Sequence, residues 1–283
     1  MQLSDNRMDI PVFVINLKRS LDRRDHTIKQ LYESGVHFRV VEAIDGTELS
    51  DQKIRNNSDF GIFKFGMHSR YLLKEEIGCT LSHLKIYRQI VDEKIELACI
   101  LEDDNDYLKD FKEVLDHVHF FSDEWDLLYL GHRSGSTSKV AQSRNKKKLM
   151  PLNYYIGEAI EVPYGSHAYI INIETAEKLL KWAYPIRMPF DSFIGNGRAL
   201  GIRTFLLSPP CAVSNYVFDS TIYTHQEILY STPLRKVVGQ FIRKTYSWFP
   251  FLRTFRVWIF LKWNSIFLFL RKTGVIRNSY AKL

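Results

Sequence analysis

The chain of 283 residues is 45% hydrophobic and 25% charged, which is ordinary for a globular protein with one large or two smaller domains. Its three cysteines, Cys79, Cys99 and Cys211, are far apart and form no CxxC pair, so neither a disulfide framework nor a zinc site is indicated. The N-terminus has acidic residues where a signal peptide is basic, and it lacks a small-residue cleavage site. We therefore expect a protein of a reducing compartment that is not secreted.

The first fifty residues predict one βαβ unit of a parallel sheet. Residues 12–17 are suited to a buried strand, residues 21–34 have the apolar spacing of a helix that Gly35 ends, and residues 37–41 predict a second strand. The carboxyl ends of these two strands are expected at the same edge of the sheet.

Strands and helices continue to alternate beyond this unit. Residues 76–93 place apolar side chains at spacings of three and four, as an amphipathic helix does, and the apolar run 97–101 predicts a strand buried on both faces. Two further strands and a helix are expected at residues 126–130, 167–173 and 174–183. This alternation predicts an α/β fold with a mostly parallel sheet flanked by helices.

Two segments show no such pattern. Residues 51–73 mix Gly, Asn and aromatic residues without a clear period, and residues 133–148 are rich in Ser, Lys and Arg. Both are expected to be loops.

The C-terminal segment differs from the rest of the chain in charge. Residues 234–283 contain eleven Lys and Arg and no acidic residue, which leaves 28 basic and 32 acidic residues before them. This charge is interleaved with Trp, Phe and Leu, and no uncharged run approaches the roughly 18 residues of a membrane-spanning helix. We therefore expect a helical segment that lies on an anionic membrane surface.

Two other roles of this segment remain open at the level of sequence. Its apolar residues are also compatible with a subdomain or oligomer contact, and basic residues among aromatic ones also occur in nucleic-acid binding, which we consider the weakest alternative. The change in composition near Thr232 and Pro233 divides the chain into an expected α/β domain, residues 1–232, which the resemblance described below identifies as catalytic, and a membrane-associating segment, residues 233–283.

Polar side chains follow the three strands that the sequence predicts first. They are Asn16, Lys18, Arg19, Arg23 and Arg24 after the first strand, Asp45 and Gly46 after the second, and Glu102, Asp103 and Asp104 after the third. Ligands of open parallel sheets bind at this edge, where the strands end.

Carboxylates beside arginines suggest a divalent metal together with an anionic ligand. Clustered carboxylates repel each other unless a positive group lies between them, and Mg²⁺ or Mn²⁺ takes oxygen ligands that it shares with substrate phosphates. The alternative is a solvated acidic turn that caps the next helix. The chain contains neither GxxxxGK[ST] nor GxGxxG, so a nucleotide would be held without these phosphate-binding loops.

Six ordered motifs resemble glycosyltransferase family 25, the lipooligosaccharide galactosyltransferases. They are VINLKRSLDRR, FRVVEAIDG, EEIGCTLSHLKIYRQIV, ILEDD, YGSHAYIINIETAEKLL and PFDSFIG, and the similar region runs from about residue 10 to residue 220. The resemblance implies a GT-A type, Rossmann-like fold in which a DxD-type motif binds a metal and the diphosphate of a UDP-sugar.

The residues of ILEDD would provide this motif. Glu102 and Asp104 are two apart, so they lie on one side of an extended chain and are the expected ligands of Mn²⁺ or Mg²⁺. Asp103 then points away unless a turn begins there. The first carboxylate is a Glu and not an Asp, so the alternative pair is Asp103 and Asp104. The expected contacts of the donor are Asn16, Arg19, Arg24, Asp45, Gly46, His83 and Asp103.

The family is also similar to inverting transferases, which need a base for the acceptor hydroxyl. Asp191 in an apolar setting is our candidate, and the alternative is a helix N-cap for residues 192–199. His83 either donates to a phosphate or sugar or is a satisfied histidine on the helix flank. Ser166, His167 and His225 are weaker candidates for substrate or metal contacts.

Together these features predict transfer of a hexose, with galactose from UDP-galactose and a β linkage expected, to a lipooligosaccharide or lipopolysaccharide acceptor. The expected location is the cytoplasmic face of a bacterial inner membrane, with no nucleic-acid partner. The alternatives are a metal-dependent phosphodiesterase, which would need more His and Asp ligands, and a non-enzymatic binding protein of the membrane surface or of nucleic acid.

Overall fold

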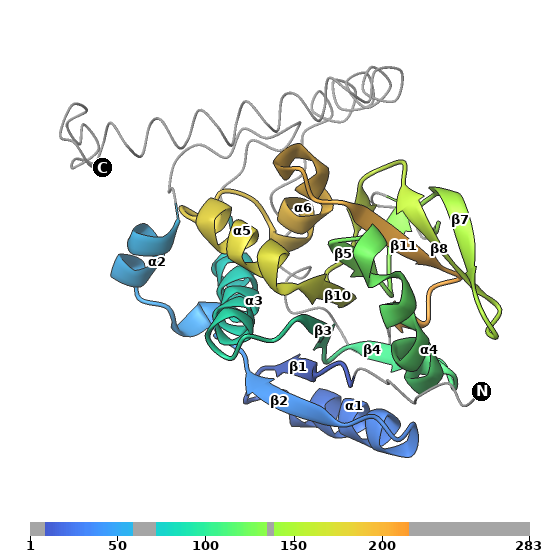
Figure 1. The fold of residues 1–283 in the computed structure, drawn as a ribbon. Coiled ribbons are helices and arrows are strands. Elements are labelled where there is room, and N and C mark those ends of the chain that lie inside the picture. Colours follow the sequence, from blue (N-terminus) through green and yellow to red (C-terminus); the bar gives the residue numbers. More distant parts are fainter. Residues whose placement is uncertain (1–8, 59–71, 135–138, 215–283) are drawn as a thin grey trace, which may run out of the picture.

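A central eight-stranded sheet organises the residues that the computed structural model describes, which are 9–58, 72–134 and 139–214 (Figure 1). In spatial order its strands are β2 (Phe38–Glu42), β1 (Val12–Asn16), β3 (Leu97–Glu102), β10 (Ala168–Asn172), β5 (Leu127–Tyr129), β11 (Thr204–Ser208), β8 (Tyr154–Ala159) and β7 (Ser143–Leu149). Strands β10 and β8 run antiparallel to both of their neighbours, and the other six share one direction. The predicted α/β fold with a mostly parallel sheet is confirmed.

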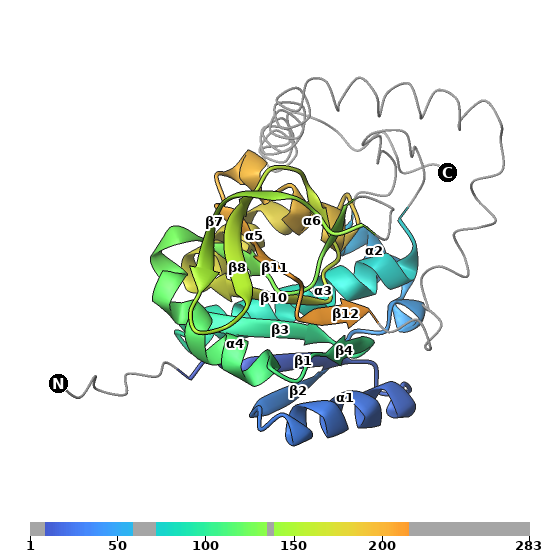
Figure 2. The same cartoon turned by 90° about the vertical axis from the view of Figure 1, so that its right-hand side faces the viewer.

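Helices cover both faces of this sheet because its central strands alternate apolar side chains between two cores. On one face Val12 and Val14 pack with residues of α1 (Leu21–Glu33) and α4 (Phe111–Val118). On the other face Phe13 and Ile15 pack with residues of α3 (Lys74–Asp92), α5 (Ile173–Ala183) and α6 (Phe190–Gly195). Figure 2 shows α1 and β2 at one end of the molecule and β7 and β8 toward the other.

The βαβ unit at the start of the chain has the predicted arrangement. Strand β1 pairs in parallel with β2 on one side and with β3 on the other. Each of the three strands lies within a residue or two of its predicted range, and α1 and α3 lie where the apolar periodicity places them. The carboxyl ends of β1, β2 and β3 therefore form one edge of the sheet.

Both predicted loops contain regular structure. Residues 51–73 begin with α2 (Asp51–Asn57), whose N-cap Ser50 accepts a hydrogen bond from Lys53 N at 3.3 Å. Residues 133–148 include β6 (Arg133–Ser134) and most of β7. The loop prediction was wrong for β7. Among the described strands it pairs with β8 alone, so its Lys and Arg side chains lie in solvent and the apolar alternation of a buried strand is missing.

Short elements complete the described part of the chain. Strand β4 (Asn105–Tyr107) pairs with β12 (Ala212–Ser214), and β6 pairs with β9 (Pro163–Tyr164). The single-turn or short 3-10 helices are η1 (Gly46–Glu48), η2 (His119–Glu124) and η3 (Gly197–Leu200).

Helix α3 packs directly against the turn that follows β2. A Cβ atom on Gly78 would lie 2.6 Å from both Gly46 N and Ile44 O, so only glycine allows this approach. Ser82, one turn further along, accepts a hydrogen bond from Ile44 N at 2.8 Å. These contacts fix the position of α3 relative to the edge where β1, β2 and β3 end.

Within residues 9–58, 72–134 and 139–214, no helix has the length and apolar character needed to cross a bilayer. The predicted C-terminal membrane segment, the boundary near Thr232 and Pro233, and His225 all lie outside the described residues.

Candidate active site at the carboxyl end of the sheet

Asn16 and Asp103 join the ends of β1 and β3. The Asn16 side-chain amide donates a hydrogen bond to Asp103 Oδ2 at 2.6 Å, and both residues are buried. Thr27 of α1 donates to the Asp103 carbonyl at 3.1 Å. The residues after the first and third strands therefore meet at one edge, as the strand order requires.

Arg23 of α1 bridges two of the three consecutive carboxylates. Its Nη2 lies 2.6 Å from Asp104 Oδ2 and 3.3 Å from Asp103 Oδ1. Asp103 faces Asn16 and Arg23, while Glu102 faces α3, so the chain turns directly after β3. Burial is the main reason that the pKa of Asp103 is raised, despite the opposing charge of Arg23.

Glu102 is held by a histidine and a serine. Its Oε1 accepts a hydrogen bond from Ser166 Oγ at 2.6 Å and lies 3.2 Å from His83 Nε2. Burial alone would raise the pKa of Glu102, but His83 and Ser166 favour its charged form more strongly and lower the pKa to about 2. Glu102 is therefore ionised at neutral pH.

Asp104 has the opposite electrostatic environment. Burial, followed by the negative charge of Glu102, raises its pKa to about 7, and Arg23 compensates only in part. Its Oδ1 atom is buried and receives no hydrogen bond from a described residue. A buried carboxylate oxygen without a donor, next to a second carboxylate, fits the oxygen ligands of Mg²⁺ or Mn²⁺.

His83 is fully buried on α3 and lies between Glu102 and a pair of tyrosines. Its Nδ1 lies 2.9 Å from the Tyr169 hydroxyl, which in turn lies 3.0 Å from the Tyr87 hydroxyl. The imidazole stacks on Phe190 with ring centroids 3.9 Å apart. Both ring nitrogens therefore face protein groups, and His83 orients Glu102 in this structure.

Asp191 lies in the first turn of α6, directly after the phenylalanine that stacks on His83. Its Oδ1 accepts a hydrogen bond from Ser192 N at 2.5 Å. The helix begins at Phe190 with Pro189 at the N-cap position, so Asp191 is not the cap of a helix over residues 192–199. Burial raises the pKa of Asp191, and the charge of Glu102 adds to this shift, as suits a carboxylate that accepts a proton.

The other predicted donor contacts lie along the edge of the sheet where β1 and β2 end, or on α1. Arg19 and Asp45 form an ion pair at 2.5 Å after β2, and Asp45 also accepts from Thr47 N at 3.0 Å. Gly46 is buried against the first turn of α3. Arg24 pairs with its neighbour Asp25 on an exposed surface of α1, and the structure does not bring it to the carboxylates.

Ser166 and His167 approach the acidic cluster from the segment directly before the antiparallel strand β10. The Ser166 hydroxyl bonds to Glu102, and the His167 carbonyl accepts hydrogen bonds from Glu102 N at 2.8 Å and from the Asn105 side chain at 2.9 Å. These contacts join segments more than 60 residues apart in the sequence, and they fix the backbone at the point where β3 ends.

Cys79 is a site residue that our sequence reasoning missed. It lies one turn before His83 on α3, and its sulfur, a nitrogen of His83 and a carboxylate oxygen of Glu102 lie within 4.8 Å of one another. A search for CxxC pairs does not detect this group. The available signal was the spacing of four residues between a cysteine and a histidine on a predicted helix.

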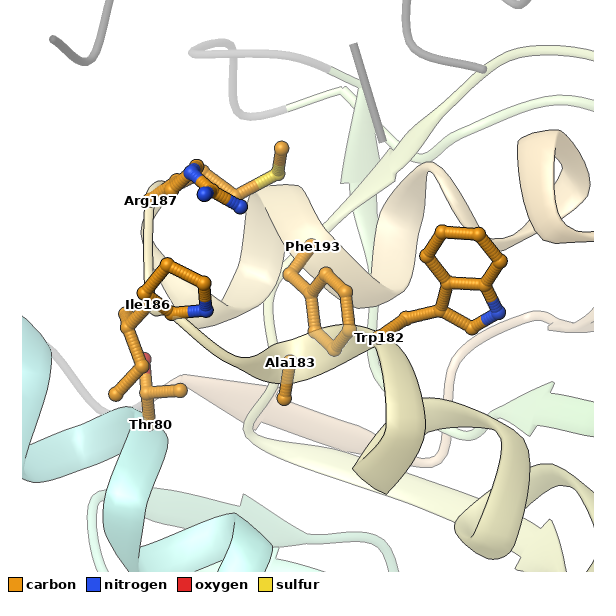
Figure 3. A pocket seen from close by; sticks show the side chains of 8 residues that line it. Thr80, Trp182, Ala183, Ile186, Arg187 and Phe193 are labelled. Atoms are coloured by element: carbon orange, nitrogen blue, oxygen red, sulfur yellow. The ribbon is translucent and has the colours of Figure 1, made fainter. Parts of the chain in front are cut away.

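A small pocket opens on the same face of the sheet (Figure 3). Figure 3 shows Thr80 of α3 at the lower edge, Ala183 and Trp182 from the end of α5, and the ring of Phe193 of α6 between these two in the view. Thr80 follows Cys79 in the sequence, and Phe193 lies two residues after Asp191. Two residues that line the pocket, Thr80 and Phe193, are therefore sequence neighbours of the site residues Cys79 and Asp191.

A family model described as glycosyltransferase family 25 (LPS biosynthesis protein) matches residues 9–194. The chain is 31% identical over 191 residues to procollagen galactosyltransferase 2 of Homo sapiens and 31% identical over 194 residues to procollagen galactosyltransferase 1 of Danio rerio. These matches cover 65% of this chain and 29% and 30% of the relatives, so the similar region spans less than a third of their length.

The first of two further comparisons limits what similarity conveys about activity. The chain is also 30% identical to the inactive glycosyltransferase 25 family member 3 of Homo sapiens, over 65% of this chain and 31% of that protein. A solved glycosyltransferase involved in glycosylation of the major capsid of PBCV-1 aligns with a TM-score of 0.43 and 9% identity, over 75% of this chain and 95% of that one. Activity must therefore be argued from the residues of the site.

The raised pKa of Asp104 predicts a pH-dependent stability. A carboxyl group whose pKa is higher in the folded than in the unfolded protein lowers the free energy of unfolding as the pH rises between the two values, here from 3.8 to about 7. In metal-free buffer, Asp104→Asn should therefore be more stable than the wild type at pH 8, by up to about 4 kcal/mol, with the difference vanishing near pH 4.

Urea unfolding of both proteins from pH 4 to pH 8 measures this difference, with Asp106→Asn as the matched control because Asp106 forms an exposed pair with His26. Mn²⁺ should stabilise the wild type more than Asp104→Asn. If the wild type were more stable than Asp104→Asn at pH 8 without metal, Arg23 would already offset the full cost of ionising the buried Asp104, which would contradict this prediction.

Proposed function

Because the chain belongs to glycosyltransferase family 25, we propose that it transfers galactose from UDP-galactose, with inversion, to a lipooligosaccharide or lipopolysaccharide acceptor. The observation that supports catalysis by this chain is the acidic cluster after β3, in which the buried Asp104 Oδ1 has no donor among the described residues. Similarity to proteins named galactosyltransferases supports the donor sugar, and the family description supports the acceptor.

In this proposal Glu102 and Asp104 hold Mn²⁺ or Mg²⁺, which would neutralise charge on the diphosphate of the donor. His83 and Ser166 keep Glu102 ionised and fixed in orientation. Arg23 limits repulsion between Asp103 and Asp104. Preorganised charges of this kind act without reorganisation during the reaction.

We place the remaining donor contacts at the edge of the sheet where β1, β2 and β3 end. Asn16 and Asp103 are joined to each other at the base of the site, while Arg19, Asp45 and Gly46 line the edge after β2. We assign these residues to the nucleoside and sugar of the donor. Arg24 would reach the donor only after leaving Asp25.

Asp191 is the proposed general base. As the acceptor oxygen attacks the anomeric carbon, the bond from that carbon to the diphosphate breaks, UDP leaves, and the hydroxyl proton passes to Asp191. The raised pKa of Asp191 and its place beside Phe190, which contacts His83, support this role.

A panel of radiolabelled UDP-hexoses tests the proposal directly, with the purified full-length protein and two acceptors, lipooligosaccharide and a procollagen peptide. We expect Mn²⁺-dependent incorporation from UDP-galactose into lipooligosaccharide, which EDTA abolishes. Incorporation into the peptide alone would show that the acceptor is procollagen, which the names of the relatives contain, and not lipooligosaccharide. Hydrolysis of a phosphodiester without incorporation would favour the phosphodiesterase alternative.

Asp191→Asn should slow transfer by roughly 10² to 10⁴ while the affinity for the UDP-sugar changes little, because a base is lost but a donor contact is not. Steady-state kinetics and a UDP-sugar titration measure the two quantities. Ser192→Ala is the matched control, since it alters the same turn without removing the carboxylate. A melting temperature that falls in proportion to activity would instead identify Asp191 as a structural residue of α6.

We also propose that residues 233–283 attach the enzyme to the cytoplasmic face of the bacterial inner membrane. The eleven positive charges of residues 234–283 contribute up to about 1 kcal/mol each at an anionic surface, and only those that face lipid contribute. The full-length protein should sediment with anionic vesicles and be released only in part by high salt, since apolar insertion is not screened. Equal sedimentation with neutral vesicles would contradict the role of charge.

A further inference from the structure

Three ligand-type side chains from two elements converge beside the acidic cluster. Cys79 and His83 are four residues apart on α3, so their side chains leave the same face of the helix. Glu102 reaches this face from the end of β3. The sulfur, imidazole nitrogen and carboxylate oxygen of these residues lie within 4.8 Å of one another.

The surroundings of His83 resemble those of a histidine that binds a metal. In such sites the second ring nitrogen is bonded to a protein group, which fixes the tautomer and the ring orientation. Here Nδ1 lies 2.9 Å from the Tyr169 hydroxyl, and Phe190 stacks on the ring at 3.9 Å. In the metal-free structure Nε2 is the nitrogen that bonds to Glu102, so a cation bound at Nε2 would take the place of the proton in that bond.

The distance between the two ligand atoms also fits. His83 Nε2 and Glu102 Oε1 lie 3.2 Å apart. Two ligands on one tetrahedral cation, each bound at about 2.0 Å, are separated by about 3.3 Å. The positions that form a hydrogen bond in the absence of metal are thus close to those that both atoms would take around a cation.

The charge around Cys79 favours a cation. The carboxylate of Glu102 lies within 4.8 Å of the Cys79 sulfur, and Asp104 follows Glu102 by two residues. These carboxylates attract a cation, which would displace the thiol proton of Cys79 on binding.

We propose that Cys79, His83 and Glu102 form a binding site for a thiophilic divalent cation such as Zn²⁺, with water as the fourth ligand. Binding displaces the Cys79 proton to solvent, and the proton on His83 Nε2 that bonds to Glu102 moves to Nδ1 or to solvent, so that Nε2 presents its lone pair to the cation. The ligand set of one sulfur, one nitrogen and one oxygen selects Zn²⁺ or Co²⁺, whereas Mg²⁺ and Mn²⁺ prefer the oxygens of Glu102 and Asp104.

The shared ligand has a consequence that rests on the proposed function. Glu102 is a ligand in both sites, so its negative charge cannot serve Zn²⁺ beside Cys79 and His83 and fully serve the cation at the donor diphosphate at the same time. Zn²⁺ bound to Cys79 therefore inhibits transfer in competition with the catalytic cation.

Co²⁺ is the probe for this site because its bond to a thiolate gives a charge-transfer band in the near ultraviolet. Titration of Co²⁺ into the reduced, full-length protein should produce this band with saturation at one equivalent, and Zn²⁺ should remove it, since Zn²⁺ binds such ligands more tightly. Cys79→Ser should abolish the band and weaken Zn²⁺ binding, measured by calorimetry, by at least about tenfold.

The variant retains the two other cysteines, Cys99 and Cys211, which are both fully buried. Loss of the band would therefore assign it to Cys79, and an unchanged melting temperature would confirm that the variant is folded. A band that persists in Cys79→Ser, or a wild type without a band, would overturn the proposal.

Asp104→Asn separates this site from the catalytic one. It should keep the Co²⁺ band, because Asp104 is not among the three ligands, even though it is expected to lose metal-dependent transfer. Loss of the band in Asp104→Asn would show a single cation site centred on the acidic cluster and would contradict the proposal. The Co²⁺ spectra are recorded without a UDP-sugar. They therefore test the zinc site even if the protein does not transfer galactose.

Discussion

Negative charge at the end of β3 is the constraint on which the site depends. Three consecutive carboxyl groups leave a buried strand at one point, and each is compensated differently. Glu102 is held by His83 and Ser166, while Arg23 bridges Asp103 and Asp104. The compensation is incomplete, because Asp104 keeps a raised pKa and a buried oxygen without a donor among the described residues. A bound cation would offset this cost, so binding and folding are coupled at this site.

The fold supports this arrangement through close packing of α3. Gly78 allows the helix to contact the backbone of Ile44 and Gly46, and one turn later His83 lies against the end of β3. His83 is therefore presented by a rigid helix and not by a loop. The same register places Cys79 beside Glu102. The position of this one helix thus determines both the orientation of the proposed metal-binding carboxylate, Glu102, and the composition of the proposed zinc site.

Sequence patterns predicted the part of the fold that local periodicity determines. The strands β1, β2 and β3 and the helices α1 and α3 have strong apolar repeats, and their order places Asn16 beside Asp103. Strand β7 was missed because its side chains are solvated at a sheet edge. The contact of Ser166 with Glu102 and the grouping of Cys79 with His83 depend on long-range packing, which no local pattern contains. The similarity to family 25 indicated the acidic motif, but not how its charges are distributed.

The central claim is that the carboxylates after β3 bind a divalent cation for glycosyl transfer, and Mn²⁺ binding tests it most directly. Free Mn²⁺ can be followed by its electron paramagnetic resonance signal during titration of the full-length protein. The account predicts saturable binding that Glu102→Gln weakens by at least about tenfold and that Asp106→Asn leaves unchanged. Equal Mn²⁺ affinity in the wild type and in Glu102→Gln would contradict it.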